Sequence, residues 1–458
     1  MPQEKLSLFD NFLILYPIKI KTKIRNKMQA PIDKNIVEKA IAGLEIADFS
    51  KATIREVVAI ANKLEKETGV EFIHMEMGVP GLPAAKIGVE AEINALKNGV
   101  ASIYPSIDGL PELKNESSRF IKAFIDLDIS SKCCVPVVGS MQGTFTSFLV
   151  AGQCNPEKDT VLFIDPGFPV QKQQITVLGY KYESFDVYDY RGEKLKAILD
   201  QYLSKGNIAA IIYSNPNNPA WFCLKDEELK IIGDAANKYD VIVLEDLAYF
   251  AMDFRKDLGI PFQAPFQPSV GKYTDNYLLL ISGSKAFSYA GQRIGVVAMS
   301  DKLYHRTYPG LTQRYGGGTF GSVFIHRALY AISSGTSHSA QYALAAMFKA
   351  AADGSFQFLE DVKEYGRRAH KMKAIFLKHG FEIVYDKDLD EDVADGFYFT
   401  ISYPGMTGGE LMRALIPYGI SAISLVTTGS RQEGLRACTS FIKDNQYQLL
   451  DERLATFH

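Results

Sequence analysis

The chain has 458 residues, of which 47% are hydrophobic and 22% charged, a composition typical of globular proteins large enough for two domains. Its net charge of −3 favours neither nucleic acid nor an anionic membrane, and we find no apolar stretch of about 20 residues that would predict a membrane-spanning helix. The spacing of the 5 cysteines and 7 histidines fits neither a zinc site nor a disulfide framework, so we expect no metal, reduced thiols and a cytoplasmic protein.

Residues 1–27 differ in character from the rest of the chain. An apolar run at 12–16 precedes a basic cluster at 19–27, whereas a secretory signal carries its positive charge first. We therefore interpret 1–27 as a flexible N-terminal extension, with an interfacial membrane anchor as the alternative.

Helical and strand-like patterns alternate from residue 30 onward. Residues 54–64 have helical periodicity, and 71–75 form a short strand candidate. Seven short and largely apolar segments follow, at 135–138, 160–164, 181–185, 209–213, 241–244, 277–281 and 294–298. Such runs are typical of strands buried on both faces of a sheet, and the amphipathic stretches 193–203 and 225–238 predict crossover helices between them. This region predicts an α/β domain with a mainly parallel seven-stranded sheet between helices.

The pattern changes after about residue 320 and predicts a smaller α+β domain. The expected elements are long helices at 323–352 and 356–377, strands at 381–385, 397–401 and 435–440, and a helix at 408–415. We expect four parts of the chain: the extension 1–27, an N-terminal part of the small domain at 28–80, a large domain at 81–325 that contains the sheet, and a C-terminal small domain at 326–458.

A polar loop after the predicted strand 277–281 carries reactive side chains. Ser282-Gly283-Ser284-Lys285 is followed eight residues later by Arg293. A lysine amine can form a Schiff base, while hydroxyls and a guanidinium can bind a phosphate dianion, so the loop suits pyridoxal phosphate. The same run also fits the S-x-x-K motif of serine enzymes, in which Ser282 would be the nucleophile. The loop alone leaves both chemistries open.

Three reactive residue types follow three different predicted strands. Asn218, Asp246 and Lys285 each lie just beyond a strand's carboxyl end, where open α/β sheets bind their ligands. We expect these three residues to lie close together at one edge of the sheet. This favours pyridoxal phosphate, because serine acylation would leave Asp246 and Asn218 without a role.

With Asn217-Asn218-Pro219, Glu245-Asp246-Leu247-Ala248-Tyr249 and Ser282-x-Ser-Lys285 in this order and spacing, the chain resembles class I/II aminotransferases. These are fold type I pyridoxal phosphate enzymes related to aspartate aminotransferase, and the resemblance runs from about residue 78 to 436. It implies that Lys285 forms the Schiff base and carries the substrate proton. It also implies that Asp246 pairs with the pyridine nitrogen and that Tyr249 and Asn218 bind the cofactor's O3′ oxygen.

The resemblance assigns the cofactor phosphate to the loop 139–143 at a predicted helix N-terminus, mostly through the backbone of Ser140, Met141 and Gln142. Ser282 and Arg293 are implied as further phosphate ligands.

Four more positions are implied by the resemblance. Phe168 would stack on the pyridine ring, and Arg436 would bind the substrate α-carboxylate beneath the turn at Gly78, next to Asn218. Tyr104 would reach the cofactor phosphate of a second subunit, which implies a homodimer with shared active sites.

The expected reaction moves an amino group from an amino acid to a 2-oxo acid by a ping-pong mechanism. The alternative is a C–S β-lyase or related carbanion chemistry, because the same motifs serve both. The family commonly continues Asn-Pro-Thr-Gly, whereas this chain has Asn218-Pro219-Ala220-Trp221. Trp221 is therefore either a pocket wall or a packed loop residue, and the amino-acid substrate stays open.

Overall fold

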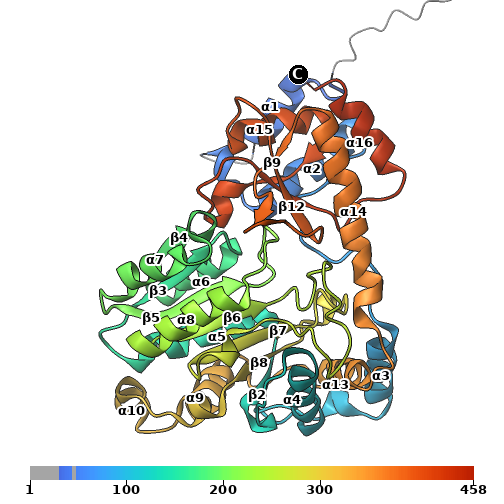
Figure 1. Ribbon diagram of the computed structural model, residues 1–458. Coiled ribbons are helices and arrows are strands. Elements are labelled where there is room, and N and C mark those ends of the chain that lie inside the picture. The colour runs from blue at the N-terminus through green and yellow to red at the C-terminus, as the bar shows by residue number, and fades with distance from the viewer. Residues whose placement is uncertain (1–29, 44–47, 458) are drawn as a thin grey trace, which may run out of the picture.

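The computed structural model describes residues 30–43 and 48–457 (Figure 1). The predicted extension 1–27 lies outside the described residues. Figure 1 shows two lobes: a broad one built on the large sheet, and a smaller one that contains the first and the last described elements of the chain. Helix α14 (Phe358–Lys378) runs from one lobe into the other.

The large lobe contains the predicted seven-stranded sheet. Its strands are β2 (Cys134–Val137), β3 (Thr160–Asp165), β4 (Lys181–Asp186), β5 (Ile208–Ser214), β6 (Ile242–Leu247), β7 (Tyr277–Ser282) and β8 (Gly295–Met299), in the order β2-β8-β7-β6-β5-β3-β4. Strands β3 to β7 pair in parallel, whereas β8 is antiparallel to both β7 and β2. Every strand except β4 is buried along its length, as the apolar runs predicted.

Helices cover this sheet on both sides (Figure 1). The helices of the large lobe are α3 (Lys86–Lys97), α4 (Pro111–Ile125), α5 (Gly139–Cys154), α6 (Pro169–Leu178), α7 (Lys194–Leu203), α8 (Asp226–Tyr239), α9 (Asp301–His305), α10 (Pro309–Tyr315), α11 (Phe320–Val323), α12 (Tyr330–Ser333) and α13 (His338–Ala352). The continuous helix predicted over 323–352 is wrong. A π-helical turn follows α11, and Ser334 (φ 56°) and Gly335 (φ 121°) break the chain before α13, because left-handed residues cannot continue a helix.

The small lobe combines both ends of the described chain. Its elements are α1 (Lys34–Ala42), α2 (Ile54–Thr68), β1 (Ile73–His74), β9 (Glu382–Ile383), β12 (Tyr398–Ser402), α15 (Gly408–Leu415), β13 (Ile420–Ser421), β14 (Ile423–Ser424), β15 (Leu435–Cys438) and α16 (Gln446–Leu454). Strands β14, β15, β12 and β9 form an antiparallel sheet, and β1 pairs in parallel with β13. Helix α2 begins with a Thr53–Glu56 capping box and ends at Gly69 (φ 71°).

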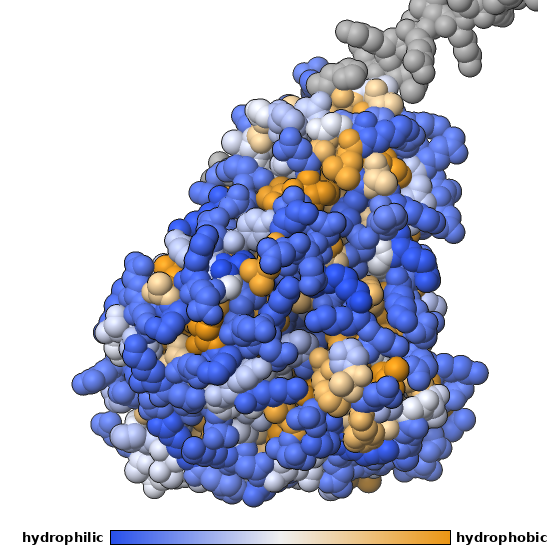
Figure 2. Space-filling view, in the orientation of Figure 1, coloured by the Kyte–Doolittle hydropathy of each residue, from blue (hydrophilic) through white to orange (hydrophobic). Residues whose placement is uncertain are grey.

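Each lobe has its own hydrophobic core, and each core contains residues from several separate parts of the chain. The small-lobe core joins side chains from 32–75 with others from 369–457, while Tyr385, Leu425 and Cys438 pack in the large core. The domain boundaries at 80 and 325 stay a prediction. The face shown in Figure 2 is mostly hydrophilic with separate apolar areas, and none of the described helices is both long and apolar enough to cross a membrane.

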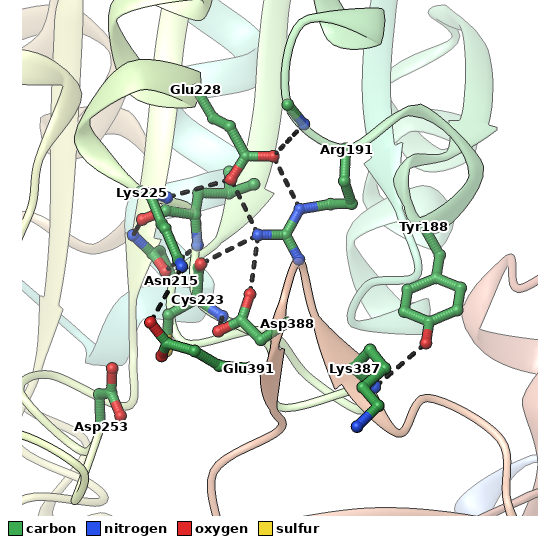
Figure 3. A network of polar contacts seen from close by, with 12 residues as sticks. Tyr188, Arg191, Asn215, Cys223, Lys225, Glu228, Asp253, Lys387, Asp388 and Glu391 are labelled. Carbon is green, nitrogen blue, oxygen red and sulfur yellow. Dashed lines mark hydrogen bonds and ion pairs between the residues drawn. The ribbon is translucent and has the colours of Figure 1, made fainter.

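A buried ionic network ties the hairpin β10 (Lys387–Asp388) and β11 (Glu391–Asp392) to the large lobe (Figure 3). The fully buried Asp388 carboxylate accepts hydrogen bonds from Arg191 (2.8 Å), Arg255 (2.7 Å) and the Cys223 backbone N–H (3.0 Å). Glu228 binds the same Arg191 guanidinium at 2.7 and 2.8 Å. The network therefore anchors the loop that follows Asn218.

Candidate active site

A cavity of about 640 Å³ lies between the lobes, at the carboxyl ends of β5, β6 and β7. Its size is within the usual range for small-molecule sites. The predicted site residues that line it are Gly78, Ser140, Met141, Phe168, Asn218, Asp246, Tyr249, Ser282, Lys285, Arg293 and Arg436. The fold therefore brings together side chains from both lobes that are up to 358 positions apart in the chain (78 to 436).

Lys285 follows β7 and points its amine into this cavity. Its Nζ donates a hydrogen bond to the Gly78 carbonyl and lies 5.0 Å from the centre of the Phe397 ring. Burial, with a smaller contribution from the Arg436 and Arg293 charges, lowers the pKa of the amine from its ordinary value of 10.5 to about 8. With such a pKa about a tenth of the amine is neutral and nucleophilic at pH 7, compared with fewer than about one in a thousand for an ordinary lysine.

Asp246 ends β6 as a buried carboxylate with only neutral partners. Its oxygens accept hydrogen bonds from the Gln171 amide (2.8 Å) and the Ala248 backbone N–H (3.1 Å). Burial raises the pKa of this carboxyl group to about 6. No cationic side chain of the described residues forms an ion pair with it, so it suits a cationic group bound in the cavity.

Asn218 and Tyr249 both line the cavity and follow the neighbouring strands β5 and β6. The Asn218 side-chain oxygen is buried without a hydrogen-bond partner among the described residues. The Tyr249 hydroxyl lies 2.8 Å from the hydroxyl of Tyr398 on β12, and both side chains are buried. These polar groups are arranged for a ligand with a hydrogen-bonding oxygen.

The lining residues from the start of α5 and the loop after β7 suit an anion. Helix α5 begins at Gly139 (φ 66°), where a Cβ would come within 2.7 Å of the Arg293 guanidinium, so only glycine permits this approach. The Ser140 hydroxyl is buried without a partner among the described residues, and Ser282 also lines the cavity. A helix N-terminus, two hydroxyls and an arginine form a phosphate site in many folds.

Arg436 on β15 is a buried cation without a carboxylate partner among the described residues. Its Nη2 donates to the Glu76 carbonyl (2.6 Å), its guanidinium lies 4.7 Å from the centre of the Tyr398 ring, and its Nε has no partner. His74 (2.7 Å) and Ser421 (2.7 Å) hold the buried Glu76 side chain and hence the carbonyl that orients the arginine. An unpaired buried guanidinium is costly unless a ligand carboxylate neutralises it.

Three residues singled out from the sequence lie outside the cavity lining. Gln142 uses its side chain to bind the Val138 backbone N–H (2.8 Å) and the Ser333 hydroxyl (2.7 Å). Tyr104 is 91% exposed on the surface. Trp221 is fully buried, with its ring 5.2 Å from that of Tyr249, so it is a packed loop residue.

The sequence analysis missed several lining residues. Gln171 lies in the first turn of α6, three residues after Phe168, and this position could have suggested it. Arg55 and Val58 from α2 and Tyr398 from β12 reach the cavity only because the small lobe closes over it. No motif indicates them, since their contacts depend on the packing of the lobes.

Comparison with known proteins identifies the family to which this fold and site belong. Residues 72–447 match the profile of the family described as aminotransferase class I and II, and the chain belongs to this family. Members of this family use pyridoxal phosphate.

Individual relatives are distant. The chain is 25% identical over 256 residues to a probable aspartate aminotransferase of Methanocaldococcus jannaschii and 29% identical over 245 residues to an LL-diaminopimelate aminotransferase of Halothermothrix orenii. These matches cover 56% and 52% of this chain and 62% and 60% of the relatives, less than two thirds of their length.

Solved structures are similar over a longer part of the chain. The aspartate aminotransferase of Thermotoga maritima superposes with a TM-score of 0.71 over 92% of this chain and 99% of its own, at 18% identity. An aminotransferase of Mycobacterium tuberculosis gives 0.71 over 90% and 97%, at 15% identity. At this level of identity the likeness establishes the fold.

Proposed function

We propose that the protein is a pyridoxal-phosphate-dependent aminotransferase that transfers an amino group from an amino acid to a 2-oxo acid by a ping-pong mechanism. The observation that carries the proposal is the set of unpaired groups around one cavity. A lysine with a lowered pKa, a buried carboxylate with only neutral partners and a buried arginine without a carboxylate all face it. Amino-acid chemistry on an aldehyde cofactor uses all three.

The residues around the cavity could bind each part of the cofactor. Lys285 would hold it covalently, Asp246 would face its ring nitrogen, and Phe168 would cover the ring. Asn218 and Tyr249 would bind its phenolic oxygen. The phosphate ligands would be Ser140, Met141, Ser282 and Arg293, and Gln142 could contribute only its backbone N–H, because its side chain is bound to Val138 and Ser333. The buried and unpartnered Asn218 oxygen and Ser140 hydroxyl support this fit, because such groups are costly without a ligand.

When bound, the cofactor supplies an electron sink for the negative charge that develops at the substrate Cα. The chain's own residues would do the rest. Arg436 would bind the α-carboxylate through its planar fork and so orient the Cα–H bond. Lys285 would then take the proton from Cα and return it, a role that requires the neutral amine near neutral pH. The lobes would exclude water around this transfer.

Absorption spectroscopy tests the proposal. Purified protein mixed with pyridoxal phosphate should develop a visible band, and Lys285→Ala should abolish it. Added amino acids, tried one at a time in a single turnover, should bleach the band and release one 2-oxo acid per site. Absence of the band in the wild-type protein, or its persistence in Lys285→Ala, would contradict the proposal. Pyruvate and ammonia released from cystathionine without an oxo-acid acceptor would favour the β-lyase.

We also propose that two copies of the chain form a homodimer near the phosphate end of the cavity. Apolar side chains are exposed on α3 (Val89, Ile93, Leu96), in the following segment (Ile103, Tyr104) and on α12 (Tyr330, Ile332). A Cβ on Gly335, two residues after α12, would lie 3.5 Å from Pro105, so the last two segments are neighbours. Light scattering should give twice the chain mass, and Ile103→Lys with Tyr104→Lys should give the monomer mass; a wild-type monomer would refute the dimer.

A further inference from the structure

We propose that Tyr398 is a positioning residue of this site: its hydroxyl accepts a hydrogen bond from the Tyr249 hydroxyl in this structure, and when Tyr249 donates to a bound ligand it becomes the donor to Tyr249 and so directs the Tyr249 proton toward that ligand. Tyr398 belongs to β12 of the small lobe, whereas Tyr249 follows β6 of the large lobe. Their hydroxyl oxygens are 2.8 Å apart, and both side chains line the cavity. The inference rests on the proposed cofactor function and adds a residue from the other lobe to it.

The protonation of the two phenols limits how they can share this hydrogen bond. Burial raises the pKa of Tyr398 to about 12 and raises that of Tyr249 as well, so each hydroxyl keeps its proton at neutral pH. Each hydroxyl has one proton to donate, and among the described residues each has the other as its partner. If Tyr249 donates to a ligand oxygen, Tyr398 must therefore be the donor to Tyr249.

Hydrogen bonds in such a chain strengthen one another, because a hydroxyl that accepts a bond becomes a better donor. The Tyr398 hydroxyl would thus increase the stabilisation that Tyr249 gives to an anionic phenolic oxygen of the cofactor. The condensed-phase strengthening is roughly 10–30% for each bond. Loss of the Tyr398 hydroxyl should consequently have a smaller effect than loss of the Tyr249 hydroxyl, and it should act only through Tyr249.

The surroundings of Tyr398 hold its hydroxyl in place. A Cβ at position 78 would overlap this hydroxyl, so Gly78 allows it to lie against the backbone. One face of the ring meets the Arg436 guanidinium at 4.7 Å, and Trp221 lies 6.2 Å away in an edge-on arrangement. Phenylalanine keeps all of these ring contacts, so Tyr398→Phe removes the hydrogen bond and little else.

The test is a pH titration of the visible band of the cofactor-loaded protein. Tyr249→Phe removes a hydrogen bond to an anion and should raise the titration midpoint by about 1–2 pH units. Tyr398→Phe should raise it by a few tenths of a unit, and should cause no further rise in the Tyr249→Phe background. The KM for the amino acid should stay within about twofold, because Arg436 keeps its ring contact. Tyr308→Phe, which removes a buried hydroxyl that has no partner among the described residues, should leave the midpoint unchanged.

The outcomes separate this inference from the proposed function. A protein that never develops a visible band contradicts the proposed function. A band that titrates with the same midpoint in wild type and Tyr398→Phe, while Tyr249→Phe shifts it, overturns the role of Tyr398 alone. An equal shift from Tyr398→Phe in the presence and absence of the Tyr249 hydroxyl would also overturn it, because the two groups would then act independently.

Discussion

Replacing Lys285 with methionine should stabilise the cofactor-free protein, although it removes the residue on which the proposed chemistry depends. Methionine fills a similar volume without a charge. Folding lowers the pKa of the amine from 10.5 to about 8, which at 1.36 kcal/mol per unit destabilises the folded state by about 3 kcal/mol at pH 7. The lost hydrogen bond to Gly78 offsets about 1 kcal/mol of this. We expect a net gain of about 2 kcal/mol in the free energy of unfolding.

The pH dependence gives the sign of this effect. Because the folded-state pKa is the lower one, the destabilisation is fully present below about pH 8 and is relieved as the pH rises toward 10.5. At pH 10 less than about 1 kcal/mol remains. The gain from Lys285→Met should therefore be lost between pH 7 and pH 10.

Urea unfolding of the cofactor-free proteins at pH 7 and pH 10 measures this difference. Lys86→Met makes the same substitution at a side chain that is 87% exposed and should change neither midpoint by much. The reasoning is refuted if the stability difference between Lys285→Met and wild type is equal at the two pH values, since packing and the hydrogen bond to Gly78 do not titrate in this way.

Three further changes test other parts of the structure. Arg436→Lys should lower kcat/KM for the amino acid about 10–100-fold, mainly through KM, because lysine cannot bind a carboxylate in a fork; unchanged steady-state kinetics would contradict this. Gly396→Ala should lower the free energy of unfolding, measured by thermal unfolding, by about 1–3 kcal/mol, because the added Cβ would overlap the Trp221 indole. Combining it with Trp221→Phe should restore part of this stability. Asp388→Asn should lower the free energy of unfolding in urea by about 3 kcal/mol, because it removes the charge from a buried ionic network. Glu391 is 57% exposed, and Glu391→Gln should lower the same free energy by less than about 1 kcal/mol. Similar losses in the two variants would contradict a stabilising role of the network.

The strands of the large sheet could be predicted because they are short apolar runs. Segments such as 160–164 and 277–281 are buried on both faces, and burial on both faces leaves a continuous apolar pattern. The direction of β8 could not be predicted, since an apolar run carries no information about which way a strand points. The break at Ser334-Gly335 was missed because the apolar residues on either side of it are compatible with one helix.

The same distinction applies to the candidate site. Asn218, Asp246 and Lys285 lie just after strands, so the order of the sheet places them at one edge and a local motif is sufficient to identify them. Tyr398 is 149 residues from its partner Tyr249. Its contact exists only because the small lobe packs over the sheet, and no local pattern describes that packing.

The composition of the small lobe from both chain ends has a consequence for biosynthesis. On the ribosome, residues 32–75 emerge long before residues 369–457, with which they share a core. The large sheet can form while the chain is still growing, whereas helices α1 and α2 must wait for β15 and α16. The pairing of β1 with β13 across nearly the whole chain should therefore be among the last events of folding. Until then the apolar faces of α1 and α2 remain exposed, and nascent chains should be most dependent on chaperones during this interval.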